Sequence, residues 1–359
     1  TTADQLSYEL NTYIRENIPE AKDEMSEYIS GALWAFKESQ IKEETVESTN
    51  DNVKLTDGFN KIYYGAPGCG KSHLVKEKYC KDDDKYERIT FHQEYTNGDF
   101  VGQIRPIVEN DIIKYDFVEG PLTRILKKAF TPGNEGNMYY LIIEELNRGN
   151  APAIFGDIFQ LLDRDKLTGN SEYPIDNDDM SKAIYGEKGK KIYIPGNVSI
   201  IATMNSSDQN VFVLDTAFKR RWEWVKISNK FSDKEDEYTT KLAEMLIPGT
   251  YMAWKDFIDT INNEILDEKY GSNGEDKQLG IYFVDDKILS LEFTDDSEKK
   301  KQFAEKIFMY LWEDVVKYGR GDMFTNPSTL DALVDDYIRD GLKVFNKGIF
   351  PSSEETKDE

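Results

Sequence analysis

The stretch Tyr63–Leu74, YYGAPGCGKSHL, decides the fold. It holds a glycine, four residues and then Gly-Lys-Ser, which is the G-x-x-x-x-G-K-[ST] pattern of a phosphate-cradling loop. The apolar run KIYY (61–64) precedes it and a helical pattern follows it, so strand, loop and helix come in the order that such a loop requires. The pattern predicts nucleotide binding and leaves open a kinase, a switch, a motor or a remodelling machine.

The residue types in this loop have chemical reasons. Glycines let backbone N–H groups turn toward phosphate oxygens. Lys71 is expected to reach the β- and γ-phosphates, and the Ser72 hydroxyl is expected to ligate Mg²⁺. His73, in the first turn of the helix, lies near the nucleotide by position. The predicted nucleotide-binding residues are Gly65, Ala66, Pro67, Gly68, Cys69, Gly70, Lys71, Ser72 and His73.

A pair of acids forms the second element. The run YLIIEELNRGN (140–150) is an apolar strand that ends in Glu144 and Glu145. We expect the first acid to hold the Mg²⁺ shell and the second to polarise water for attack on the γ-phosphate. Aspartate is usual at the first position, and the longer Glu144 is expected to weaken or reposition the metal contact. A solvated acidic helix start is disfavoured by the apolar run before the acids.

A strand-terminal asparagine is the third element. In IIATMNSSDQN (200–210) another apolar strand ends in Asn205, whose amide is expected to orient the attacking water or touch the γ-phosphate. Asp208 lies close enough along the chain to join it. A lone asparagine after a strand is more often a turn residue, so this interpretation depends on the two motifs before it.

A basic cluster is the fourth element. The run LDTAFKRRWEW (214–224) places Lys219, Arg220 and Arg221 at the end of a short helix before the last strand. An arginine there can point across a subunit boundary at a neighbour's γ-phosphate, where it contributes roughly 10³–10⁵ in rate. A solvated helix end favoured by the dipole is the alternative. The pattern does not choose between the two arginines.

Short apolar runs alternate with helical patterns from residue 57 to 228, which is typical of parallel βαβ units. The run 104–117 has two β-like stretches around Glu-Asn-Asp and predicts an inserted hairpin. The polar, Gly-rich residues 163–194 predict a long loop or a second insertion. The expected strands are 61–64, 86–91, 138–143, 198–203 and 222–227.

Helical patterns lie on both sides of this α/β region. Leu6, Leu10, Ile14 and Ile18 recur at four-residue steps before it. After it, two apolar stripes predict core packing rather than a cofactor site: Trp254, Phe257, Ile258, Ile261 and Ile265, then Phe303, Ile307, Leu311 and Val315. We therefore predict a helical segment and linker (1–54), an α/β nucleotide-binding domain (55–228), a helical lid (229–350) and an acidic tail (351–359).

The composition excludes several classes of protein. The 359 residues are 39% hydrophobic, which suits a folded chain of two or three units. A net charge of −23 repels a phosphate backbone, so standing nucleic-acid binding by the outer surface is not expected. Cys69 and Cys80 lack C-x-x-C spacing, so neither a zinc site nor a disulfide framework is expected. No apolar run approaches ~18 residues and no signal peptide is visible, so we expect a soluble, cytoplasmic chain without membrane contact.

The order of the four elements is that of AAA+ ATPases. Three longer stretches closely resemble the McrB subfamily, the NTPase motor of modification-dependent restriction systems: FHQEYTNGDFVGQIRP (91–106), EELNRGNAPAIFGDIFQLLD (144–163) and MNSSDQNVFVLDTAFKRRWEW (204–224). QLGIYF (278–283) resembles a motif in that family's lid. The resemblance covers residues 57–320 and implies an α/β AAA+ P-loop fold with a parallel central sheet, an inserted β-hairpin and a C-terminal helical lid.

The resemblance also implies partners and roles. McrB subunits form rings, usually hexameric, with nucleotide at the interfaces, and use GTP where most AAA+ proteins use ATP. Here we expect Mg²⁺ with GTP or ATP. A McrC-like nuclease is the implied partner, whose insertion into the pore stimulates hydrolysis. By motif, Lys71 and Ser72 bind phosphate and Mg²⁺, Glu144 is the metal-associated acid, Glu145 is the hydrolytic acid, Asn205 and Asp208 match the Asn and Asp of M-N-T-A-D, and Arg148, Arg220 and Arg221 are interface candidates.

The chain departs from the family at Glu144 and at Gln209, which stands where an arginine is usual. Family members normally carry an N-terminal domain that reads modified DNA, so DNA recognition is expected from a partner or a missing domain, or is absent. Two alternatives stay open. One is a MoxR-like chaperone that remodels a protein partner, and the other is a regulatory module with a non-hydrolysing site, for which Glu144 is the only support.

Overall fold

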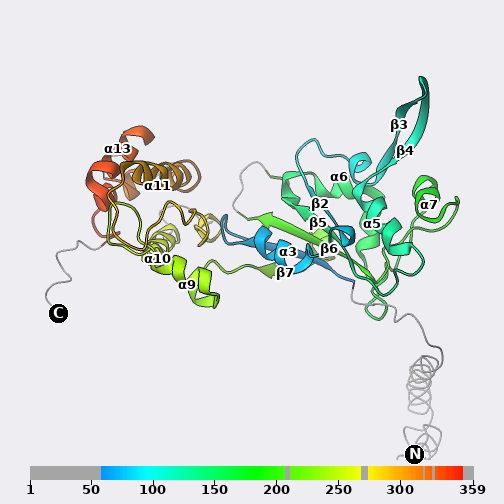
Figure 1. Cartoon of the computed structure of the whole chain (residues 1–359), viewed down its shortest axis with the longest axis horizontal. Helices are drawn as coiled ribbons and strands as arrows, with labels where there is room; N and C mark the ends of the chain where they lie inside the picture. The colour runs from blue at the N-terminus through cyan, green and yellow to red at the C-terminus, as the bar shows by residue number, and fades with distance from the viewer. Residues whose placement is uncertain (1–57, 207–210, 268–273, 318–319, 326–327, 351–359) are drawn as a thin grey trace, which may run out of the picture. The chain divides into compact units, whose positions relative to one another are not determined.

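The five apolar runs pair into one parallel sheet in the order β2-β5-β6-β1-β7 (Figure 1). The chain is described by a computed structural model that covers residues 58–206, 211–267, 274–317, 320–325 and 328–350, all of them within the compact unit Lys54–Glu359. The predicted α/β class is therefore confirmed. The strands are β1 Asn60–Gly65, β2 Tyr86–Thr90, β5 Tyr139–Glu144, β6 Val198–Asn205 and β7 Glu223–Lys226.

Several predicted features lie outside the described residues. These are the helical segment and linker at 1–54, the acidic tail at 351–359, and Asp208 with Gln209. Among the residues that the structure describes, no helix is long and apolar enough to cross a membrane. The proposed boundary between the α/β and helical parts at 228 and 229 stays a prediction.

Side-chain alternation along the strands separates the core into two layers. On β5, Leu141 and Ile143 join the larger hydrophobic core, while Ile142 faces the opposite layer. Val75 and Tyr79 of the helix after the phosphate loop cover the Ile142 layer. Because both faces of the central strands are buried, they read as almost continuous apolar runs.

The helices of the α/β part connect these strands. They are α3 Lys71–Tyr79, α4 Asn97–Phe100, α5 Pro121–Phe130, α6 Ala151–Phe155, α7 Asp178–Tyr185 and α8 Thr216–Lys219. The prediction of loop or insertion over 163–194 missed α7. This helix is capped at both ends. The Asn177 side chain accepts a hydrogen bond from the Met180 N–H at the start, and Gly186 takes the left-handed conformation at the end.

The predicted hairpin is formed by β3 Gly102–Glu109 and β4 Ile112–Glu119. Asn110 and Asp111 connect the strands with φ of 53° and 61°, the left-handed pair of a two-residue type I′ turn. In Figure 1 the hairpin extends away from the sheet. Its register places three apolar pairs on one face: Ile104 with Phe117, Pro106 with Tyr115, and Val108 with Ile113.

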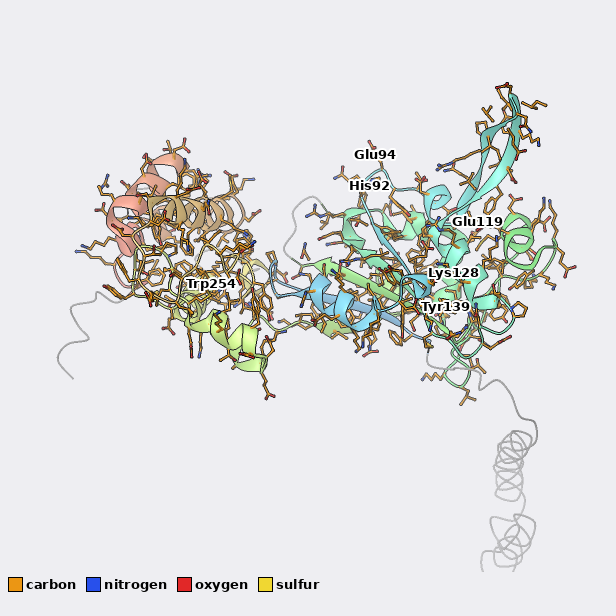
Figure 2. All side chains as sticks on the ribbon, in the orientation of Figure 1. His92, Glu94, Glu119, Lys128, Tyr139 and Trp254 are labelled. Carbon is orange, nitrogen blue, oxygen red and sulfur yellow. The ribbon has the colours of Figure 1, made fainter. Side chains whose placement is uncertain are left out.

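The C-terminal part is helical and has its own hydrophobic core. Both predicted apolar stripes are buried in that core, which confirms the predicted core packing. Trp254, labelled in Figure 2, is fully buried and donates its indole N–H to the Ile281 carbonyl at 2.8 Å. The helices are α9 Glu237–Glu244, α10 Trp254–Ile265, α11 Ser297–Tyr310, the π-helical turn η8 Leu311–Val315, α12 Arg320–Met323 and α13 Leu330–Asp340.

Candidate nucleotide site

The sheet brings the separate motifs to one edge. Gly65, which ends β1, pairs with Asn205, which ends β6. Glu144 ends β5, the strand on the other side of β6. Because parallel strands end at the same edge, loop, acids and amide lie together, as their positions in the chain predicted.

The phosphate loop has the backbone of an anion site. Gly68 and Gly70 have φ of 79° and 93°, which other residues rarely adopt. Helix α3 starts at Lys71 with no side-chain cap, so the N–H groups of its first turn are available to phosphate oxygens. The Lys71 ammonium donates to the carbonyls of Gly65 at 3.0 Å and Ala66 at 2.9 Å. The cation is thus held against its own loop.

Glu144 is the centre of a polar network. Its Oε2 accepts from the Ser72 hydroxyl at 2.8 Å and from the Thr203 hydroxyl at 2.5 Å. Its Oε1 accepts from both Nε and Nη2 of Arg88, at 3.1 and 2.7 Å. A hydroxyl and a carboxylate side by side are the hard oxygen ligands that Mg²⁺ takes together with phosphate and water, so these residues fit the ion. The extra methylene of Glu144 does not prevent its carboxylate from reaching Ser72.

Glu145 is held in an uncommon conformation. Its φ of 56° lies in the left-handed region, which residues other than glycine seldom adopt. The Asn205 amide donates to both carboxylate oxygens at 3.1 Å, and the Arg148 Nε lies 3.3 Å from Oε2. The predicted acid and amide are therefore in direct contact.

The QLGIYF segment lies on the outer side of the phosphate loop. The N–H of Gly280 donates to the Pro67 carbonyl and that of Tyr282 to the Gly68 carbonyl, each at 2.9 Å. A Cβ on Gly280 would lie 2.1 Å from the Gly68 carbonyl carbon, so only glycine allows this approach. Asn262 of α10 holds the segment from behind through both polar groups of Leu279. The QLGIYF segment therefore bonds to the carbonyl groups of the phosphate loop. The N–H groups of the loop stay available to phosphate.

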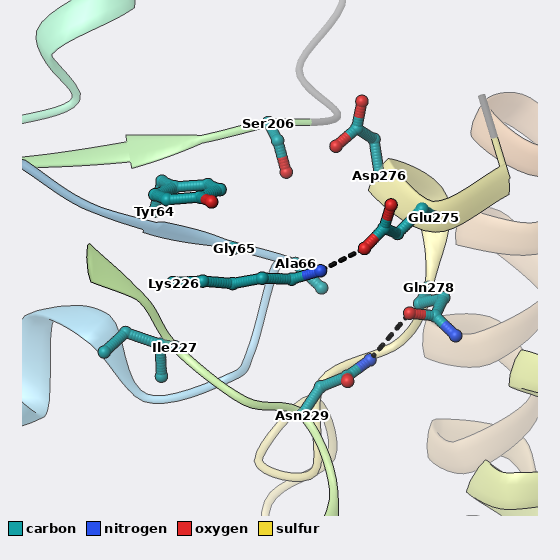
Figure 3. A pocket seen from close by; sticks show the side chains of 10 residues that line it. All are labelled: Tyr64, Gly65, Ala66, Ser206, Lys226, Ile227, Asn229, Glu275, Asp276 and Gln278. Atoms are coloured by element: carbon teal, nitrogen blue, oxygen red, sulfur yellow. Dashed lines mark hydrogen bonds and ion pairs between the residues drawn. The ribbon is translucent and has the colours of Figure 1, made fainter. Parts of the chain in front are cut away.

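A small cavity remains between the loop and the lid (Figure 3). Its volume of 120 Å³ is below the roughly 300–1,000 Å³ of small-molecule sites. The Lys226 ammonium and Glu275 carboxylate form an ion pair across it, and Asn229 donates to Gln278. Its lining is Tyr64, Gly65, Ala66, Ser206, Lys226, Ile227, Asn229, Glu275, Asp276 and Gln278. This cavity alone is therefore too small for a whole nucleotide.

Comparison with known proteins agrees with this geometry. Residues 61–222 match the AAA domain of the dynein-related subfamily. The chain is 37% identical over 308 residues to the type II restriction enzyme BsuMI component YdiS of Bacillus subtilis, covering 77% of this chain and 85% of that one. It is also 30% identical over 207 residues to the type IV methyl-directed restriction enzyme EcoKMcrB subunit of Escherichia coli, covering 55% of this chain and 41% of that one. The chain belongs to the McrB-type AAA proteins.

The arginine pair of this McrB-type protein lies at the other end of the sheet. Arg221 pairs with Asp163 at 2.6 Å, donates to the Ala217 carbonyl, and lies 4.0 Å over the Phe159 ring. Arg220 is exposed and makes no ion pair with a described residue. Arg221 thus stabilises its own chain, while Arg220 is available to another molecule.

Three further residues concern the site: His73, which was predicted, and Arg88 and Thr203, which were not. His73 is exposed. Its Nε2 lies 3.2 Å from the carboxylate Oε1 of Glu77, one helical turn further along α3. Arg88 and Thr203 contact Glu144 and were missed. Both lie on strands that were predicted correctly, but no local pattern marks an inward-pointing arginine or threonine as a partner of an acid on a neighbouring strand.

Proposed function

We propose that this chain is the motor subunit of a restriction system, which hydrolyses GTP or ATP at interfaces between copies and drives a separate McrC-like nuclease in anti-phage defence. The observation that carries the proposal is the contact of Glu145 with Asn205 beside the Ser72–Glu144 pair. The restriction enzymes among the relatives support the biological role. DNA recognition is assigned to a partner or to a further domain.

Binding begins at the phosphate loop. Lys71 exchanges the carbonyls of Gly65 and Ala66 for the β- and γ-phosphates, which are stronger acceptors because they are charged. The uncapped start of α3 supplies N–H groups to the same phosphates. Ser72 and Glu144 would hold Mg²⁺, which would neutralise charge on the phosphate oxygens.

Hydrolysis depends on a positioned base. Glu145 accepts a proton from the attacking water, and the two contacts from Asn205 fix the carboxylate plane for that purpose. Arg88 donates to Oε1 of Glu144, and this bond fixes the orientation of the Glu144 carboxylate. Glu144 therefore does not compete with Glu145 for the attacking water.

A second copy supplies the remaining cation. Arg220 lies where β7 begins and the phosphate loop lies where β1 ends, roughly 20 Å apart at about 3.3 Å per strand residue. Arg220 therefore cannot reach the nucleotide of its own chain. We assign Arg220 to the γ-phosphate of a neighbour, where it would stabilise negative charge, so that turnover would be a property of a ring.

The test is phosphate release with GTP and with ATP, side by side, over a series of protein concentrations. Turnover per chain that rises with concentration, together with a ring by light scattering, supports the proposal. Full turnover by a chain that light scattering shows to be a monomer removes the interface from the mechanism. GTP selectivity favours the restriction role, and addition of a McrC-like nuclease is then expected to raise the rate.

A further inference from the structure

The carboxylate of Glu144 is held by an arginine from the edge strand of the sheet. Arg88 of β2 pairs in register with Ile142 of β5, two residues before Glu144. Side chains two residues apart on a strand share a face, so Arg88 and Glu144 are diagonal neighbours on the face that α3 covers. The arginine lies outside the stretches that resemble the McrB subfamily, and the acid stands where aspartate is usual. The contact is therefore not part of the four motifs and needs an account of its own.

The two oxygens of Glu144 have different kinds of partner. Oε2 accepts from the hydroxyls of Ser72 and Thr203, which are neutral, can rotate and have lone pairs of their own. Oε1 accepts from Nε and Nη2 of Arg88, at 3.1 and 2.7 Å. A guanidinium has only N–H donors and a permanent positive charge, so it does not share an oxygen with a metal cation. Glu144 therefore offers a cation one oxygen rather than two.

The contact between Arg88 and Glu144 is not a solvated surface pair. The Glu144 side chain is 10% exposed and that of Arg88 is 33% exposed. A charge-assisted hydrogen bond in such a place is stronger than a neutral one and is screened less by salt than an exposed pair. The arginine is thus expected to stay on Oε1 when a cation and a nucleotide enter the site.

We propose that Arg88 is a positioning residue that makes the nucleotide site selective for Mg²⁺ over Ca²⁺, by restricting Glu144 to a contact through one oxygen. The inference rests on the proposed function, in which Ser72 and Glu144 take the cation that accompanies the nucleotide. Mg²⁺ demands octahedral geometry and keeps several waters, whereas Ca²⁺ takes more oxygens and often both oxygens of one carboxylate. A carboxylate with one oxygen already held by a guanidinium suits Mg²⁺ and lacks a ligand for Ca²⁺.

The first experiment measures the affinity of the full chain for fluorescent, non-hydrolysable GTP and ATP analogues, in Mg²⁺ and in Ca²⁺. The parent chain should bind more tightly in Mg²⁺. Arg88→Met removes the charge and the donors at similar length, and the ratio of the two affinities should fall roughly tenfold as Ca²⁺ gains the second oxygen. A parent chain that binds equally well in both ions, or an unchanged ratio in the Arg88→Met chain, overturns the proposal.

Arg124→Met is the matched control. Nε and Nη2 of Arg124 both donate to one oxygen of Glu87, at 3.2 and 2.8 Å, which repeats the arrangement at Glu144. Glu87 precedes Arg88 on β2 and therefore points to the other face of the sheet. The control should leave the ratio of affinities unchanged. If Arg88 only stabilised the fold, both variants would lower the urea midpoint and neither would change the ratio.

Two further variants test how Arg88 acts. Arg88→Lys retains the charge without the paired donors and should recover part of the selectivity that Arg88→Met loses. No recovery would overturn the role of a cation at this position. In a chain that carries Glu144→Asp, whose shorter acid ends one methylene earlier, Arg88→Met should change the ratio by less than about twofold. A full effect in that chain would show that the arginine does not act through Glu144.

These measurements do not depend on turnover. A chain that binds the analogues selectively in Mg²⁺ but releases no phosphate from GTP or ATP would contradict the proposed hydrolysis and leave the role of Arg88 standing. Normal turnover together with a ratio that Arg88→Met does not change would contradict the role of Arg88 alone. Failure of the inference and failure of the proposed function are therefore distinguishable.

Discussion

The two ends of the central sheet differ in how their charges are paired. At the carboxyl end, Glu144 is bound by Arg88 and Glu145 by Asn205, so the acids of the site are oriented within the chain. At the amino end, Arg221 is paired with Asp163, whereas Arg220 is exposed and forms no ion pair with a described residue. One end is therefore a network of oriented acids, whereas the other holds one paired arginine and one exposed arginine that is available to another molecule.

The largest effect is expected from the amino end. Arg220→Ala should lower turnover by roughly 10³–10⁵, because a neighbour's γ-phosphate loses its cation, while urea unfolding stays unchanged. Phosphate release by the purified variant measures this. Mixing it with Lys71→Ala chains should restore some turnover at mixed interfaces. No restoration at any ratio, with mixed assemblies verified, would show that the arginine acts within its own chain or not at all.

The acid of the carboxyl end should have the next largest effect. Glu145→Gln keeps the shape and loses the proton acceptor, so turnover should fall by roughly 10²–10⁴ with nucleotide affinity and assembly retained. Single-turnover hydrolysis measures the rate of the chemical step, and equilibrium binding measures the nucleotide affinity. Glu94→Gln, at an exposed acid labelled in Figure 2, is the matched control. Normal hydrolysis by the Glu145→Gln chain would refute the base assignment.

Nucleotide affinity reports on the phosphate loop itself. Lys71→Ala should weaken it by roughly a hundredfold, because a charge-assisted contact to the phosphates is lost. Titration with a fluorescent nucleotide measures the change. Lys76→Ala, on the exposed side of α3, should bind as the parent does. Equal affinities for both variants would mean that Lys71 remains on the loop carbonyls when nucleotide binds.

The smallest effect concerns the arginine that is already paired. Arg221→Ala removes the ion pair to Asp163 and the contact with the Phe159 ring, and should lower the free energy of unfolding by about 1–2 kcal/mol, since the pair is partly exposed. Urea unfolding measures it. A stability loss in Arg220→Ala instead would exchange the roles of the two residues.

The sequence predicted the fold and the residue types of the site, but it did not predict which charged side chains pair with each other. The phosphate loop, Glu145 and Asn205 were predictable because each follows an apolar strand, and parallel strands bring their ends together. Arg220 and Arg221 are adjacent in the chain, and only the position of Asp163 in space distinguishes them. Arg164 gave no signal at all, because its partners are three backbone carbonyls from two separate segments.

Cys69 can serve as a chemical probe of opening of the phosphate loop. Its thiol is fully buried, with Sγ 3.8 Å from the Lys71 ammonium, so an alkylating reagent reaches it only when the loop or the lid opens. The chain has one other cysteine, Cys80, whose thiol pKa is raised by burial and which a serine can replace. The alkylation rate of the remaining thiol then reports how often the loop is open, and at high reagent concentration it approaches the opening rate itself, without turnover.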